Sequence, residues 1–173
     1  MGFLDFLRRR RREDSVAAWS GMSEDERFYL MTCSELLEEI SSVIEGVVVM
    51  HDFFWGKASE AEYREEMERC RELTRSTLGS AAYMKPPERF KEMHEHILRG
   101  LRYYERSYKE SLDYLNDRRR EHIADAIKLA LLGSAEIKDS SKIWEQIKRE
   151  IAERTNAMHR GSKRGRGGED NID

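Results

Sequence analysis

The chain has 173 residues, 38% of them charged, and a formal net charge of −3. This length predicts one domain with its own core, and a charge so close to balance gives no general attraction to nucleic acid. The two prolines are adjacent, at positions 86 and 87, and strand-like alternation is hard to find, so we expect an all-α protein of long, solvated helices. No stretch reaches the roughly 18 consecutive apolar residues that a membrane span requires.

The first 20 residues form a separate N-terminal segment, residues 1–20, in which an apolar patch precedes five consecutive arginines. A short helix of this pattern suits an anionic membrane surface or a partner, and the alternative is a solvated terminus. A secretory signal would place its charge before a longer apolar run, so this order favours the cytoplasm. The predicted membrane or partner contacts are Phe3, Leu4, Phe6, Leu7, Arg8, Arg9, Arg10, Arg11 and Arg12.

A long first helix is predicted from Ser23 to about Trp55. The sequence Ser-Glu-Asp-Glu at 23–26 has the spacing of a capping box, and Gly56 ends the helix. At 1.5 Å per residue this helix is about 50 Å long. Gly46, in its second half, is expected to mark a close approach of another helix.

Apolar and half-apolar residues of this helix recur in steps of three and four, which predicts one core-facing seam. A second stripe at Leu36, Val43 and Met50 widens the seam. The later helices are therefore expected to pack on this first one. The seam consists of Leu30, Cys33, Leu37, Ile40, Ile44, Val47, His51 and Phe54.

The second helix is predicted to begin at a capping box that spans Ser59 to Glu62 and to end near Met84, before the two prolines. Its seam also recurs in steps of three and four, and its outer face is rich in Glu and Arg. The seam consists of Tyr63, Met67, Cys70, Thr74, Thr77 and Ala81.

The third helix follows from Pro87 and ends at a turn formed by Asn116 and Asp117. His94 falls on its seam, whereas His96 is rotated by about 200° and is expected to face solvent. The seam consists of Phe90, His94, Ile97, Leu101, Tyr104, Tyr108 and Leu115, with Leu98 and Leu112 beside it.

A fourth helix is predicted from about Glu121 to Ala157, although the pairs at 133–134 (Gly-Ser) and 140–141 (Ser-Ser) could kink or split it. Residues 159–173 form a tail that is expected to be disordered. Short connections between long amphipathic helices predict an up-down-up-down bundle of four helices over residues 21–158, preceded by the short N-terminal helical segment.

The hairpin register of such a bundle places His51, Tyr63 and Tyr108 at one level. These three side chains are expected to form a polar layer within the core, where a buried histidine bonds a tyrosine hydroxyl and fixes the helix register. The alternative is a small-ligand pocket at the same layer. The register also sets Cys70 far from Cys33, which favours two buried free thiols over a disulfide.

Motifs for catalysis and metal binding are missing from the sequence. It has no nucleophile elbow, no phosphate-binding glycine loop and no paired histidines or cysteines with metal-ligand spacing. Di-iron bundles need a glutamate three residues before a histidine on two helices, and no histidine here has one. We therefore predict no enzymatic activity, no cofactor and no metal.

These observations favour a non-enzymatic interaction or scaffold protein that binds a protein partner or forms a homodimer, and that is peripheral to the membrane through residues 1–12. The first alternative is a small-ligand-binding bundle that uses His51, Tyr63 and Tyr108. The weaker alternative is nucleic-acid association through the arginine-rich ends. Acidic residues in the tail offset its basic ones, which makes nucleic acid the less favoured partner.

Overall fold

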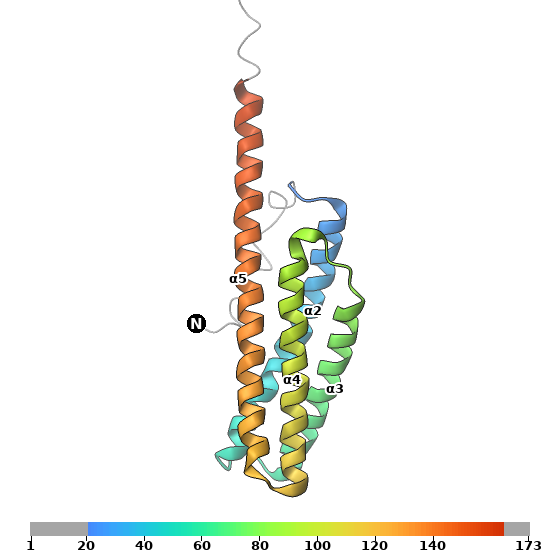
Figure 1. Cartoon of the computed structure of the whole chain (residues 1–173), viewed down its shortest axis with the longest axis vertical. Helices are drawn as coiled ribbons and strands as arrows, with labels where there is room; N and C mark the ends of the chain where they lie inside the picture. The colour runs from blue at the N-terminus through green and yellow to red at the C-terminus, as the bar shows by residue number, and fades with distance from the viewer. Residues whose placement is uncertain (1–20, 165–173) are drawn as a thin grey trace, which may run out of the picture.

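The structure, a computed structural model, describes residues 21–164, which form long antiparallel helices joined by short connections (Figure 1). The predicted all-α bundle of four long helices is confirmed. The predicted N-terminal helical segment lies outside the described residues. In chain order the elements are α2 (Glu24–Phe54), α3 (Glu60–Tyr83), the 3-10 turn η1 (Glu88–Phe90), α4 (Lys91–Asp117) and α5 (Arg120–Arg164).

Local sequence signals set the ends of α2 and α3. The Ser23 hydroxyl accepts a hydrogen bond from the Glu26 amide, and the Glu26 carboxylate accepts one from the Ser23 amide, which forms the predicted capping box. Ser59 and Glu62 repeat this pair at the start of α3. Gly56, just after α2, has a φ of 69°, a left-handed conformation that favours glycine.

The buried face of α2 is rotated relative to the predicted seam. The centre of the buried face is the second stripe of the sequence analysis, because Leu36, Val43 and Met50 are all buried. His51 and Phe54, at the end of the predicted seam, are exposed. The physical reason is that α2 runs obliquely behind α4 (Figure 1), so that its buried stripe drifts around the helix along its length.

The predicted seams of α3 and α4 are buried as expected, and α4 takes the central position between α3 and α5. Because α4 packs against α3 on one side and α5 on the other, the face of α4 that carries His96 is partly covered by α5. His96 is therefore half-buried against α5, where its Nδ1 lies 2.7 Å from Glu136 Oε2. The prediction that His96 faces solvent is wrong.

Close contacts at glycines join α4 to α5. A Cβ atom at Gly100 would lie 2.8 Å from Ile137 Cδ1 and 3.2 Å from the Gly133 carbonyl oxygen. Gly133 therefore serves helix packing, and α5 continues through it without a break. In the same way, a Cβ at Gly46 would lie 2.5 Å from Cys70 Sγ, which confirms the close approach predicted there.

Within residues 21–164, the helices pack mainly on their neighbours in chain order. α5 packs along α4, whereas α2 and α5 hardly touch each other within residues 21–164. α5 also extends to Arg164, past its predicted end at Ala157, because the single Gly161 costs only about 1 kcal/mol in a helix. Its last turns project beyond the other helices (Figure 1). No helix in the described part combines the length and apolarity needed to cross a membrane.

Candidate functional site

The predicted polar layer does not form. The side chain of His51 is 61% exposed, and its Nδ1 lies 3.4 Å from Asp52 Oδ1 instead of near a tyrosine. Tyr63 is buried and stacks on Phe53, with ring centroids 4.2 Å apart. Tyr108 is also buried, and its hydroxyl donates to the Val43 carbonyl. The oblique path of α2 turns His51 outward, which removes the observation on which a ligand pocket at this level rested.

The predicted membrane or partner contacts, Phe3 to Arg12, lie outside the described residues. The structure therefore leaves this part of the sequence analysis as a prediction.

A buried network that the sequence analysis missed joins the first turns of α2 to α4. The Tyr29 hydroxyl lies 3.1 Å from His94 Nδ1, and both residues are buried. His94 also bonds the Ala81 carbonyl at the end of α3, while burial lowers the pKa of His94. The ring is therefore neutral and can accept from Tyr29 and donate to Ala81. Because its polar groups are paired, this network fixes the positions of three helices.

The two cysteines are free and buried, as predicted. Burial raises the pKa of the Cys33 thiol to about 11 and that of Cys70 to about 12. Since the thiolate is the nucleophile and the metal ligand, both thiols are chemically quiet at neutral pH.

A shallow groove of about 350 Å³ lies beside the buried network, between the start of α2 and the connection from α3 to η1. Phe28, Pro86 and Pro87 contribute to its walls, and Asp25 and Lys85 are its charged members. Tyr29 and Thr32 are its other polar members.

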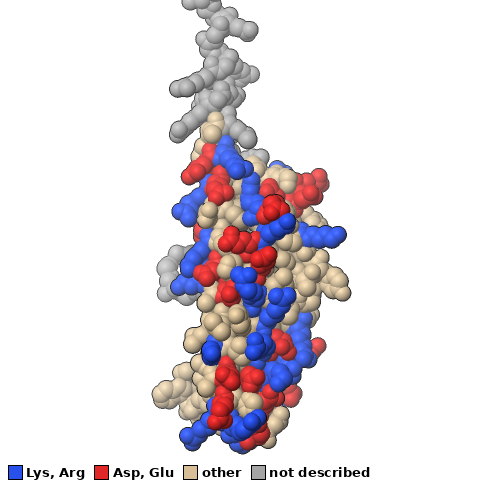
Figure 2. Space-filling model, viewed as in Figure 1, with Lys and Arg blue, Asp and Glu red and all other residues tan. Residues whose placement is uncertain are grey.

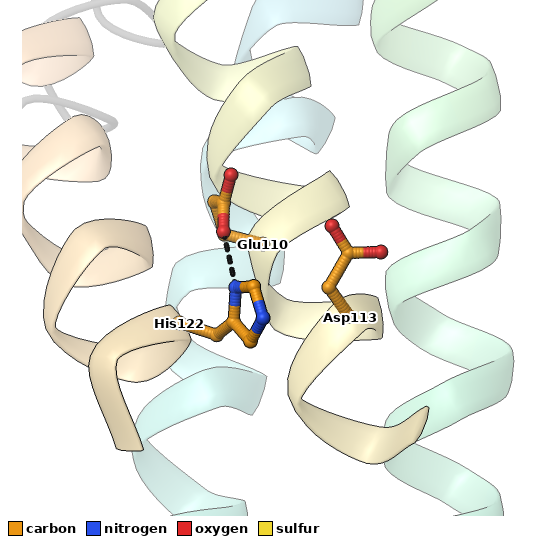
Figure 3. A group of neighbouring side chains, drawn as sticks. All are labelled: Glu110, Asp113 and His122. Atoms are coloured by element: carbon orange, nitrogen blue, oxygen red, sulfur yellow. Dashed lines mark hydrogen bonds and ion pairs between the residues drawn. The ribbon is translucent and has the colours of Figure 1, made fainter. Parts of the chain in front are cut away.

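A second histidine cluster lies at the opposite end of the bundle, where α4 ends and α5 begins (Figure 3). Glu110 and Asp113 are three residues apart and project from α4, and His122 projects toward them from the first turn of α5. The His122 Nδ1 atom lies 2.6 Å from Glu110 Oε2. One donor atom from each of these three residues lies within 4.8 Å of the other two.

The turn that precedes α5 supports this cluster. The Asp117 carboxylate accepts from the Arg119 backbone amide, and its Oδ2 lies 3.1 Å from His122 Nε2. Glu110, first, and Asp117 raise the pKa of His122, because each carboxylate stabilises the charged ring. The imidazolium form of His122 balances these acidic groups together with Lys109, which pairs with Asp113, and Arg119, which pairs with Asp117.

The sequence analysis assigned no role to Glu110, Asp113 or His122. A signal was nonetheless present, since a Glu-x-x-Asp pair on the last turns of one helix and a histidine on the first turn of the next must come together in a tight hairpin. None of the metal-binding motifs considered above has this arrangement, in which two carboxylates of one helix meet a histidine of the next.

Charges of both signs are intermingled over the face shown in Figure 2, without an area of a single sign on that face. Large apolar side chains are exposed at the two ends of α2 and in the first third of α5. They are Phe28, Met31, Val48, Phe54, Trp55, Ile127, Leu131 and Leu132, with Tyr83 at the end of α3.

Comparison with protein-family models, curated proteins and solved structures finds no match to the chain. Its function must therefore be argued from its own residues.

Proposed function

We propose that this chain is a non-enzymatic helical interaction protein that forms a homodimer through the outer faces of α2 and α5. The observation that carries the proposal is the apolar surface of α5, where Ile127 is 46% and Leu131 is 67% exposed. These residues are four apart and share one helix face. A partner surface that covers them would remove apolar area from water, which stabilises the complex by about 25 cal/mol for each square ångström buried.

The outer face of α2 carries apolar residues at the same end of the bundle. Val48 is 61% exposed, and Trp55, which caps the helix, is 71% exposed. Hydrogen bonds from neighbouring positions of α4 reach both the Val43 and the Ala126 carbonyls, so the last turns of α2 lie level with the first turns of α5. The two apolar surfaces can therefore meet in a dimer.

Charges at the other end of these helices are complementary. The Phe90 ring contacts both Tyr29 and Trp144, which sets the start of α2 level with the second half of α5. Most exposed charged side chains of α2 at this end are acidic, and most of those on α5 are basic, with Arg27 and Glu153 as exceptions. The acidic ones include Glu24, Asp25 and Glu35 on α2, and the basic ones include Lys138, Lys142 and Arg149 on α5.

A twofold axis parallel to the helices satisfies both patterns at once. It sets α2 of one protomer against α5 of its partner, with apolar ends together and acidic turns beside basic ones, and the second contact repeats the first. A protein partner with the same two-part surface is the competing occupant.

The experiment is sedimentation equilibrium of the full chain at several concentrations. We expect a dimer that Leu131→Lys converts to a monomer, because it buries a charge in the apolar part of the interface. Tyr83→Lys is the matched control, since Tyr83 is exposed at the end of α3, outside the proposed interface. A wild-type chain that stays monomeric, or a Leu131→Lys variant that still dimerises like wild type, would contradict the proposal.

We also propose that residues 1–12 contact an anionic membrane. The protein is then cytoplasmic, and it lies at the membrane surface when this contact forms. Four apolar side chains followed by five arginines support binding to anionic lipid, at about 1 kcal/mol for each basic residue. Liposome co-sedimentation should recover the full chain with anionic vesicles and leave a version that begins at Ser15 in solution. Equal recovery of both versions, or equal recovery on neutral lipid, would refute this contact.

A further inference from the structure

The carboxylates of Glu110 and Asp113 and the imidazole of His122 offer one nitrogen and two oxygen donors from two helices. Zinc ligands in proteins are nitrogen, oxygen and sulfur atoms at about 2.0–2.3 Å, arranged as a tetrahedron. Magnesium and calcium prefer six or more oxygens, which three side chains with one imidazole do not supply. The donor set therefore fits a transition metal.

The geometry is close to that of a metal site. Two ligands of a tetrahedral zinc ion are about 3.4 Å apart. The donors lie within 4.8 Å of one another, with the closest pair, His122 Nδ1 and Glu110 Oε2, 2.6 Å apart. Movements of the donor atoms by about an ångström therefore bring them to the 3.4 Å spacing of zinc ligands. All three side chains are half-buried, so an ion can enter without opening the bundle.

The orientation of the His122 ring is already that of a metal ligand. Histidines that bind metal through one nitrogen usually donate the other N–H to a carboxylate. Here Nε2 lies 3.1 Å from Asp117 Oδ2, while Nδ1 points to Glu110 (Figure 3). When the proton that now lies between Nδ1 and Glu110 is lost, Asp117 can accept from Nε2–H and so hold the ring with Nδ1 available to an ion.

Neighbouring cations compete with a metal only in part. Lys109 Nζ pairs with Asp113 Oδ2 at 2.5 Å, but a carboxylate has a second oxygen for an ion. Arg119 lies on the side of the ring away from Nδ1, where its Nε donates to Asp117 Oδ2 at 2.6 Å and its Nη2 lies 3.1 Å from His122 Nε2, so it shares Asp117 with His122. The proton on Nδ1 is the direct competitor, and it must leave when the metal binds.

We propose that Glu110, Asp113 and His122 bind one divalent transition-metal ion, for which Zn²⁺ is the probe, with Asp117 as the residue that positions His122. The ion replaces the His122 proton as the cation of the cluster and leaves a fourth coordination position for water. It ties the end of α4 to the start of α5, which stabilises the hairpin.

The experiment is isothermal titration of the full chain with Zn²⁺ at neutral pH. We expect one strong site per chain, weakened at least about tenfold in both His122→Asn and Asp113→Asn. Asp113→Asn is the cleaner variant, because it removes a donor and leaves the pair of His122 with Glu110 in place. His51→Asn is the matched control, since His51 is exposed and lies beside a single carboxylate, that of Asp52.

Circular dichroism of each variant shows whether it is folded before titration. Wild-type affinity in His122→Asn and Asp113→Asn, or no stoichiometric binding by the wild type, would overturn the proposal. Equal weakening in His51→Asn would also overturn it, because it would indicate non-specific surface binding.

Discussion

His94 and His122 lie near opposite ends of α4 and occupy opposite electrostatic environments. His94 is buried beside a tyrosine hydroxyl and a backbone carbonyl, and burial lowers its pKa. His122 is half-buried between the carboxylates of Glu110 and Asp117, which raise its pKa. The same side chain is thus a neutral structural group at one end, whereas at the other its charged form is stabilised by carboxylates, because the partners differ in charge and burial.

The two histidines should differ most in the stability that is lost when each imidazole ring is removed. His94→Ala leaves a cavity and an unpaired Tyr29 hydroxyl, so we expect a loss of about 3 kcal/mol in the free energy of unfolding. His122→Ala at the surface end should lose far less. Urea denaturation of both variants measures the contrast, and similar losses would show that the two sites do not differ in this way.

Removal of the Tyr29 hydroxyl tests its hydrogen bond with His94 alone, and it should have a smaller effect on stability. Tyr29→Phe keeps the ring and removes the hydroxyl, which leaves His94 Nδ1 without its partner in the core. We expect a loss of about 1–3 kcal/mol, the usual range for a buried polar atom without a partner. Tyr83→Phe, at an exposed tyrosine, is the control and should match wild type. A neutral Tyr29→Phe variant would mean that water or another group replaces the hydroxyl.

The pH dependence should have opposite signs at the two sites. A raised pKa means that His122 stabilises the fold below its unfolded pKa of about 6.5, and that this contribution disappears as the pH rises through its folded pKa. A lowered pKa means that His94 costs stability as the pH falls from its unfolded pKa towards its folded pKa.

Titration followed by NMR in metal-free buffer tests this difference. His122 should have a pKa above, and His94 a pKa below, the ordinary histidine value. Glu110→Gln should lower the pKa of His122 and leave that of His94 unchanged, since Glu110 is the first cause of the shift. It should also reduce stability more at pH 6 than at pH 9. An unchanged His122 pKa in this variant would refute the role assigned to Glu110.

The smallest expected effect concerns the thiols. Because burial raises the pKa values of Cys33 and Cys70, neither should react with a thiol reagent on the folded chain at neutral pH, and both should react after unfolding. Rapid reaction of either cysteine in the native protein would indicate local opening of the core.

The sequence by itself determined the ends of α2 and α3 and the buried faces of α3 and α4. Capping boxes at Ser23 and Ser59, Gly56 and the paired prolines act within one or two turns, so their effect can be read locally. The seam of α3, from Tyr63 to Ala81, is buried at every predicted position, because its regular spacing keeps these residues on one face of the helix.

Only the tertiary structure decided the rotation of α2, the continuity of α5 through Gly133 and the pairing of each histidine. A crossing angle depends on which side chains interdigitate between two helices, and it turned His51 outward and brought Tyr29 to His94. The cluster of Glu110, Asp113 and His122 likewise needed the hairpin that joins two helices. These contacts arise between distant or separately folded segments, so no local pattern specifies them.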